Sequence, residues 1–400
     1  MKIAGIIAEY NPFHNGHAYQ IEAARKAGAT HIICVMSGNF TQRGDVAIMD
    51  KLARTRCVLS AGADLVLELP TVYSLSSASH FARGGVEILR NTGCVDMLHF
   101  GSECGNVELL KDAVYTIIEL EARQLVDYKT NTVASARTVA LREYGRDDLA
   151  DLLESPNNLL GVEYIMALKK RYSHIQPQTV ARTGTGHDSA FTTDTICSAT
   201  QLRRFLTKYP EDAQSFWPES CQSIYQELVE AGQAPITLDQ LNLPILSRLR
   251  MVEPAYLSQI AGVCEGLENR LYGAIREGKT LQEIADTVKT KRYPLSKIRR
   301  ILLCAALGIT AKDVEMNPAY LRVLGQNEKG NEILRVMTKT ATLPIIAKAA
   351  HFENLSKEGK RQFRLENLAT DLYTMAFSPM GNCGTELTRN IYSYTKGGTL

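Results

Sequence analysis

Two histidines stand close together near the start of the chain, in AEYNPFHNGHAYQIEAA at residues 8–24. His14 and His17 are three residues apart, whereas a metal-binding pair on one helical face is four apart and needs a third ligand. Core packing fits poorly too, because the loop around them is polar and turn-forming. Two imidazoles with free backbone amides at the start of a helix suit phosphate oxygens, and Gly16 would let the phosphates approach. The pattern favours phosphate over a metal ion or core packing.

Short strand-like runs alternate with helical stretches over the first two hundred residues, and these elements must position the loop. The strand-like runs cover residues 2–10, 31–38, 64–70, 96–102 and 175–184. The first of them are apolar on both faces, which is typical of parallel strands covered by helices on both sides. The pattern predicts an α/β fold with a doubly wound parallel sheet of the Rossmann type. In such sheets ligands bind beyond the carboxyl ends of the strands, where the loop with His14 and His17 would lie.

After about residue 209 the pattern changes, and the remainder is almost wholly helical by its apolar spacing. The sequence therefore predicts an α/β domain over residues 1–209 and an α-helical domain over residues 210–400. The second region contains GAIREGKT, at residues 273–280, which matches the phosphate-loop pattern. An amphipathic helix precedes it instead of a strand, so Gly278 suits a helix C-cap and Thr280 the N-cap of the next helix. We interpret this segment as a helix–turn–helix junction.

The composition is that of a soluble globular protein, with 45 basic and 43 acidic residues and a formal net charge of +2. Any nucleic-acid surface must then be a local patch. No run reaches the roughly 20 apolar residues that span a bilayer, so no membrane partner is expected. The nine cysteines contain no CxxC pair. Without an export signal, they predict free thiols and a cytoplasmic location.

Several motifs resemble those of known enzymes. HNGH after a first strand is similar to the HxGH signature of the nucleotidylyltransferase superfamily, and CSATQLRR at residues 197–204 is similar to its ISSTxxR signature. Ser198, Thr200 and Arg203 keep the offsets of that second signature. Cys197 and Ala199 depart from it, which leaves Arg203 as the phosphate contact there. Five blocks in order resemble the tRNA(Met) cytidine acetate ligase family over essentially the full length: EYNPFHNGH, VMSGNFTQRGD, KLARTRCVLSAGADLVLELP, FGSE and SPNNLLGVEY.

This resemblance implies a nucleotidylyltransferase-like catalytic domain and a reaction in two steps. ATP and acetate would give acetyl-adenylate and pyrophosphate, and the acetyl group would pass to N4 of wobble cytidine 34 of elongator tRNA(Met). His14 and His17 would be catalytic, stabilising charge at the α-phosphorus and on pyrophosphate. Acetate is already a nucleophile, so the first step needs positioning and charge neutralisation and no general base. Arg43, Lys51 and Arg54 are candidate assisting cations, although a solvated helix face is the alternative for the last two.

The family's ATP-binding pattern carries over to the positions Ile7, Ala8, Glu9, Tyr10, Asn11, Pro12, Phe13, His14, Asn15, Gly16, His17, Gly101, Asn157 and Arg182. At Gly101 a side chain would obstruct the nucleotide, though an ordinary strand-end turn is the alternative. Residues 155–156 suit the N-cap and N1 of a helix, which presents Asn157 and Asn158. One of the two should bind ATP, and we favour Asn157. Arg182 ends a strand, where an always-charged group favours a ligand contact.

The segment VKTKRYPLSKIRR, at residues 288–300, carries six basic residues and no acid. We predict tRNA contacts there at Lys289, Lys291, Arg292, Lys297 and Arg300, with Tyr293 available to stack on a base. The alternative is a solvated helix pair whose apolar residues face the core. Both can hold, because one helix can have a basic outer face and an apolar inner face.

Two other functions compete with the ligase. A small-molecule adenylyltransferase or a pantothenate-synthetase-like ligase would share the nucleotidyl transfer, but would not require the long helical half. An RNA-binding protein with a vestigial ATP site would have no reason to retain both histidines and the glycine. Mg²⁺ is compatible with ATP chemistry, yet the sequence contains no carboxylate that marks a site for it.

Overall fold

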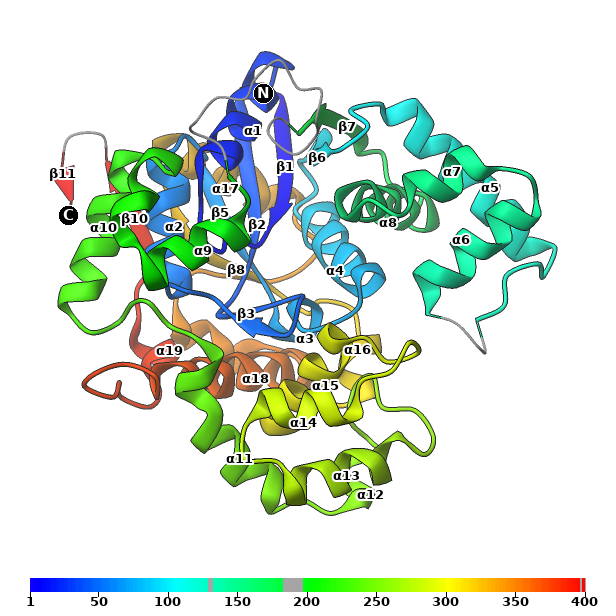
Figure 1. Ribbon diagram of the computed structural model, residues 1–400. Coiled ribbons are helices and arrows are strands. Elements are labelled where there is room, and N and C mark those ends of the chain that lie inside the picture. Colours follow the sequence, from blue (N-terminus) through cyan, green and yellow to red (C-terminus); the bar gives the residue numbers. More distant parts are fainter. Residues whose placement is uncertain (129–131, 183–196, 396–397, 400) are drawn as a thin grey trace.

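The computed structural model describes residues 1–128, 132–182, 197–395 and 398–399, and within them a nine-stranded sheet carries helices on both faces (Figure 1). Its parallel strands are β1 (Ile3–Ala8), β2 (His31–Ser37), β5 (Leu65–Leu69), β6 (Met97–Ser102) and β7 (Gln176–Ala181). They lie in the order β5-β2-β1-β6-β7. The chain thus adds β2 and β5 on one side of β1 and then β6 and β7 on the other side. This confirms the doubly wound fold and places the reversal of strand order between β1 and β6, where such sheets bind ligands.

Successive residues of the central strands enter two different apolar cores. Ile3 and Ile7 of β1 join the core with α4 (Ala78–Asn91) and α8 (Pro156–Lys170). Ala4 and Ile6 join the core with α1 (Asn15–Lys26), α2 (Lys51–Ser60), α9 (Ala199–Lys208) and α10 (Glu219–Glu230). Burial on both faces explains why these strands are apolar throughout in the sequence.

The other elements extend this framework. Between β2 and β7 lie β3 (Phe40–Thr41), β4 (Asp45–Val46), α3 (Thr71–Ser74), α5 (Val107–Ala122), α6 (Val133–Glu143) and α7 (Asp147–Leu152). A helical lobe follows α10, with α11 (Asn242–Arg250), α12 (Pro254–Leu257), α13 (Leu267–Glu277), α14 (Leu281–Val288), α15 (Leu295–Leu307) and α16 (Ala311–Glu315). The chain ends with β8 (Leu321–Gln326), α17 (Glu328–Thr340), β9 (Ile345–Ile346), α18 (Lys357–Thr374), α19 (Thr385–Thr388), β10 (Tyr392–Thr395) and β11 (Gly398–Thr399). Short 3-10 turns cover Pro210–Phe216, Leu238–Leu241 and Ala349–Asn354.

The C-terminal half also supplies strands, which the sequence pattern did not reveal. β8 is buried throughout and pairs antiparallel with β5, and β10 pairs with β8. Arg322 interrupts the apolar pattern of β8, yet it is only 4% exposed because it faces Glu386 from α19. Because the charge of Arg322 is neutralised by a residue distant in the chain, the apolar pattern alone did not predict β8 as a buried strand. The sheet therefore crosses the predicted domain division at residue 209.

The phosphate-loop look-alike is a helix–turn–helix junction, as predicted. Gly278 is the C-cap of α13, and the Thr280 hydroxyl at the N-cap of α14 accepts a hydrogen bond from the Glu283 amide. Across the described ranges, no helix combines the length and apolarity that crossing a membrane would require.

Candidate active site

The two histidines cap the helix that follows β1. His14 is the N-cap of α1, and its Nδ1 accepts a hydrogen bond from the Gly16 amide (3.1 Å). The His14 amide in turn donates to Nδ1 of His17 (3.3 Å). The rings stack with centroids 3.7 Å apart. Each side chain thus fixes the other at the carboxyl end of β1, next to the reversal of strand order.

This geometry makes the imidazoles neutral donors. Burial, reinforced by the positive charge of Arg182, lowers the pKa of His14 to about 3. Burial, then His14 and Arg182, also lowers the pKa of His17 well below its ordinary value. Since each Nδ1 accepts a backbone N–H, the single ring proton of the neutral form lies on Nε2. Each imidazole therefore has one remaining N–H donor, at Nε2, of a kind that can bind a phosphate oxygen.

The expectation of free backbone amides at this helix start is wrong in detail. The amides of His14 and Gly16 are bonded to imidazole nitrogens, and the His17 amide donates to the His14 carbonyl oxygen at 2.8 Å. The imidazoles thus accept two of the N–H groups that a helix N-terminus would otherwise offer. Phosphate contact here would come from the imidazole Nε2 atoms.

A second group surrounds the ends of β6 and β7. Arg182, which directly follows β7, donates from Nη1 to Oδ1 of Asn157 at the start of α8 (3.3 Å). A Cβ at Gly101 would lie 3.1 Å from Cγ of Arg182, so glycine gives this arginine room above β6. The charge of Arg182 also contributes to lowering the pKa of both histidines, so this group lies within electrostatic range of them.

Glu103 belongs to this group and was missed by the sequence prediction. Its carboxylate accepts the amides of Asn157 (3.2 Å) and Asn158 (2.7 Å), and Nδ2 of Asn157 (2.6 Å). It thus caps α8 in place of Ser155, which occupies the N-cap without a side-chain bond. Its only sequence signal was its place in FGSE. Asn158 is buried and its Oδ1 accepts the Cys104 amide, which favours the half-exposed Asn157 as the ligand contact.

Arg203 approaches the loop from α9. Its Nη1 donates to the Asn11 carbonyl oxygen (2.6 Å), and its Nη2 donates to the Thr200 hydroxyl (3.2 Å). Ser198 is the N-cap of α9 and accepts the Gln201 amide. The two hydroxyls of the degraded second signature therefore hold α9 and Arg203.

The other residues of the predicted ATP-binding stretch either support the loop from the strand and the core or bond to neighbouring segments. Ile7 and Ala8 complete β1, and Pro12 is buried. Phe13 and Tyr10 lie in the second core, where both rings pack against His17. Asn11 bonds to the backbone of Val46 and Ile48, and Asn15 Nδ2 donates to the Ser215 carbonyl oxygen. The titratable side chains of this stretch are Glu9, Tyr10, His14 and His17.

The three candidate assisting cations lie in different surroundings. Arg43 is exposed on the β3–β4 turn. Arg54 is fully buried and donates to the carbonyl oxygens of Glu9 (2.7 Å), Ser37 (3.0 Å) and Gly38. It thereby fastens the ends of β1 and β2.

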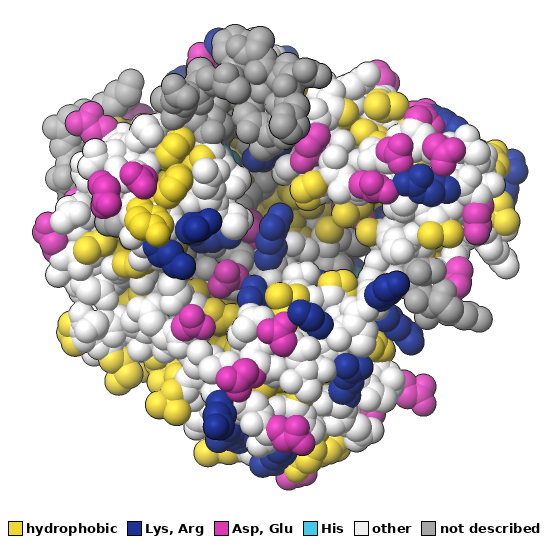
Figure 2. Space-filling model, in the orientation of Figure 1, with side chains coloured by type: hydrophobic (Ala, Val, Ile, Leu, Met, Phe, Trp, Pro, Cys, Tyr) yellow, Lys and Arg dark blue, Asp and Glu magenta, His cyan; other side chains and the backbone are white. Residues whose placement is uncertain are grey.

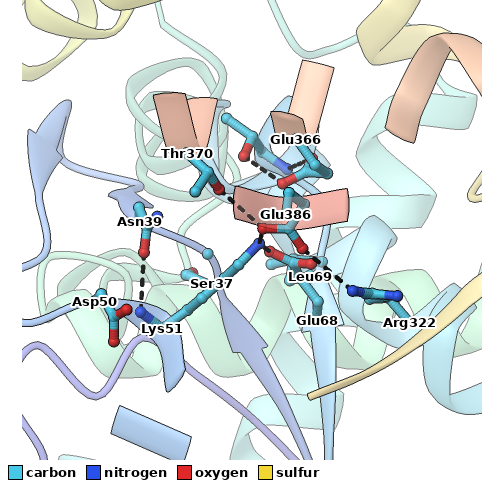
Figure 3. Close-up of polar contacts among 12 residues, drawn as sticks. Ser37, Asn39, Asp50, Lys51, Glu68, Leu69, Arg322, Glu366, Thr370 and Glu386 are labelled. Carbon is cyan, nitrogen blue, oxygen red and sulfur yellow. Dashed lines mark hydrogen bonds and ion pairs between the residues drawn. The ribbon is translucent and has the colours of Figure 1, made fainter. Parts of the chain in front are cut away.

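Lys51 lies in a buried cluster of charges, with Nζ 2.6 Å from Glu68 and 2.7 Å from Glu386 (Figure 3). The solvated-face interpretation is wrong for both Lys51 and Arg54, because each side chain is 2% exposed or less. Their paired and hydrogen-bonded head groups also argue against direct phosphate contact. The sequence could not show this, since the partners of Lys51 are distant in the chain.

The basic segment flanks the site from the helical lobe. Lys289, Lys291 and Arg292 are exposed, whereas Lys297 lies over the Tyr293 ring, 4.9 Å from its centroid. Figure 2 shows one face of the molecule. This face has a hollow near its middle, with Lys and Arg side chains along the rim of the hollow. Arg300 differs from the others, because its Nη1 donates to the Gln42 carbonyl oxygen (2.8 Å) in the β3–β4 turn. No group of three His, Cys, Asp or Glu that could hold a metal ion occurs among the described residues, and we assign no step to Mg²⁺.

Comparison with known proteins decides the family. The HIGH Nucleotidyl Transferase family matches residues 1–386. A tRNA(Met) cytidine acetate ligase of Acetivibrio thermocellus is 37% identical, covering 98% of this chain and 99% of that protein. One of Thermoanaerobacter sp. is 38% identical, covering 96% and 98%. The chain belongs to the tRNA(Met) cytidine acetate ligase family.

Solved structures agree with this membership. Thermotoga maritima TmcAL bound with alpha-thio ATP superimposes with a TM-score of 0.91 at 31% identity, covering 98% of this chain and 99% of that one. The apo form of the same protein gives a TM-score of 0.90 at 32% identity. The predicted family and the nucleotidyltransferase fold are therefore confirmed for this member of the ligase family.

Proposed function

We propose that this protein activates acetate with ATP as acetyl-adenylate and transfers the acetyl group to N4 of cytidine 34 in elongator tRNA(Met). The observation that carries the proposal is the stacked pair of neutral histidines at the reversal of strand order, in a chain of this ligase family. The Thermotoga relative is bound with alpha-thio ATP, which supports ATP as the nucleotide that this protein uses.

In the first step an acetate oxygen attacks the α-phosphorus and pyrophosphate leaves. The Nε2–H groups of His14 and His17 would donate to phosphate oxygens as negative charge grows on them. Arg182 and Arg203 would add fixed positive charge. Asn157, held by Glu103 and Arg182, would orient the nucleotide. Preorganised donors of this kind need little rearrangement during the reaction.

The function is tested by incubating the protein with ATP and labelled acetate, with and without tRNA(Met). We expect acetate-dependent pyrophosphate release and label in the tRNA at the wobble cytidine. Pyrophosphate without labelled tRNA would instead support a small-molecule product. Neither signal, with tRNA still bound, would support an RNA-binding protein without this chemistry.

The exposed part of the basic segment predicts a separable effect on RNA. Reversing Lys291 and Arg292 to glutamate should weaken tRNA binding, and the slope of log affinity against log salt should fall by about two. Acetyl-adenylate formation should persist, because neither side chain lies in the histidine site. Filter binding and pyrophosphate release measure the two effects. The matched control reverses the exposed Lys26 and Lys339, outside the segment; an equal loss of tRNA affinity there would contradict the assignment.

A further inference from the structure

Glu9, one of the predicted ATP-binding positions, carries a carboxylate just beyond the end of β1 that has no part in the first reaction step. Its Oε1 accepts the Gln42 amide at 2.6 Å. Within the described residues, no hydrogen bond is donated to its other oxygen. Burial raises its pKa, although the hydrogen bond from the Gln42 amide and then the charges of Arg203, Arg43 and Arg54 act against that rise. One carboxylate oxygen of Glu9 is thus held by Gln42, and the other is available to a substrate. Glu9 also lies only five residues before His14 in the chain.

The β3–β4 turn that fixes Glu9 is itself supported by the basic helix α15 of the other lobe. Gln42 donates its amide to Glu9 and accepts Nη1 of Arg300 on its carbonyl oxygen. The turn packs directly on α15 at Gly44, which has φ +73 and whose Cβ would lie 2.6 Å from the Arg300 amide nitrogen. Arg300 therefore supports a catalytic-domain turn from within the predicted tRNA-binding segment.

The transfer step is the one that needs such a carboxylate. When an amino nitrogen attacks acetyl-adenylate, an N–C bond forms, the C–O bond to the phosphate breaks, and AMP leaves with the electron pair. The attacking nitrogen must lose a proton, and a positioned carboxylate can accept it. Acetate attack on ATP releases no proton from the nucleophile. A base would therefore affect the second step far more than the first.

Two other carboxylates near the site are already engaged. Glu103 accepts three N–H groups at the start of α8. Asp45 faces Arg203 and accepts the Val46 amide. Among the described residues, the carboxylates of Glu9 and Asp45 each accept a single hydrogen bond, and of the two it is Glu9 that directly precedes the histidine loop.

We propose that Glu9 accepts the proton of the cytidine amino group during acetyl transfer, and that Arg300 is a positioning residue that holds Glu9 through Gln42. The inference rests on the proposed function. It also gives Arg300 a role other than RNA contact, and it links the RNA-binding lobe to the step in which RNA reacts.

The test compares two rates: acetate-dependent exchange of labelled pyrophosphate into ATP, and single-turnover transfer to saturating tRNA(Met). For Glu9→Gln, the ratio of transfer to exchange should fall about 100- to 10,000-fold, the usual contribution of a general base. For Arg300→Met, it should fall about 10- to 100-fold through misplacement, with tRNA affinity retained. Arg300→Lys should recover part of the loss, since an ammonium group can donate to the same carbonyl oxygen. Lys26→Met, at the far end of α1, is the control.

Other outcomes overturn the inference. An equal fall of exchange and transfer in Glu9→Gln would make Glu9 part of ATP binding or folding. Weakened tRNA binding in Arg300→Met, with normal transfer at saturation, would make Arg300 an RNA contact. Gly44→Ala tests positioning without removing a charge, and an unchanged ratio there would refute the role of the turn. A wild-type protein without either activity would overturn the proposed function and this inference with it.

Discussion

Replacing His14 or His17 by alanine is expected to lower the rate of acetate-dependent pyrophosphate release about 100- to 1,000-fold. That is the usual cost of removing one preorganised donor from a developing oxyanion. The expected loss is large because the pair is one unit, in which each imidazole Nδ1 accepts a backbone amide and the rings stack at 3.7 Å. Removing either ring loses one Nε2 donor and loosens the other. The measurement is pyrophosphate release at saturating ATP and acetate.

A buried histidine at the amino-terminal end of a neighbouring strand supplies the control. His31 begins β2, is 7% exposed and contacts Glu332, so His31→Gln should leave the rate close to wild type. The pH profile gives a second check. Because the pKa of His14 is about 3, lowering the pH from 8 to 5 should not protonate it. A rate that rose as histidine protonated near its ordinary pKa would contradict neutral donors.

The sequence was sufficient where function depends on neighbours in the chain. The HNGH loop follows a recognisable strand, and His14 and His17 complete their capping box within four residues. Arg182 was found because it ends a strand on the predicted rim of the sheet. The central strands β1, β2 and β5 could be predicted because burial on both faces makes them largely apolar.

The sequence was insufficient where a residue's meaning depends on a distant partner. In the sequence, Glu103 resembles any polar residue of a turn. Only the fold shows that its carboxylate accepts two backbone amides at the start of α8. Arg54 has the pattern of a surface cation, yet it binds three carbonyl oxygens at the ends of two strands. Arg300 belongs to a basic run, and only the fold brings it to Gln42. Charged residues count as solvent-exposed in pattern reasoning, so buried and paired ones are misassigned.

The largest expected effect on stability comes from Lys51. This residue is 2% exposed and lies between Glu68 of β5 and Glu386 of α19, while Arg322 lies 3.5 Å from Glu386 (Figure 3). Burial alone would lower the pKa of Lys51, but Glu386 and Glu68 raise it above its ordinary value. Burial, then the charge of Glu68, raises the pKa of the neighbouring Glu366 to about 8. With Glu366 protonated at neutral pH, two cations balance two carboxylates.

Lys51→Met is therefore expected to lower the free energy of unfolding by about 3–5 kcal/mol, because it leaves a buried carboxylate without compensation. Denaturant unfolding at pH 7 measures the loss. Removal of an exposed partner should cost far less. Lys289→Met, which breaks the exposed pair with Asp286, is the matched control.

The pH dependence and a double variant separate charge from packing. Without Lys51, the pKa of Glu68 or Glu386 rises above its unfolded value, so the folded state binds more protons and the variant loses stability as pH rises. The deficit of Lys51→Met should then be smaller at pH 5 than at pH 8. Adding Glu68→Gln should recover part of the lost stability at pH 8, since it removes the uncompensated charge. If the double variant is no more stable than Lys51→Met, packing of the lysine stem and not its charge holds β5 to the C-terminal helices.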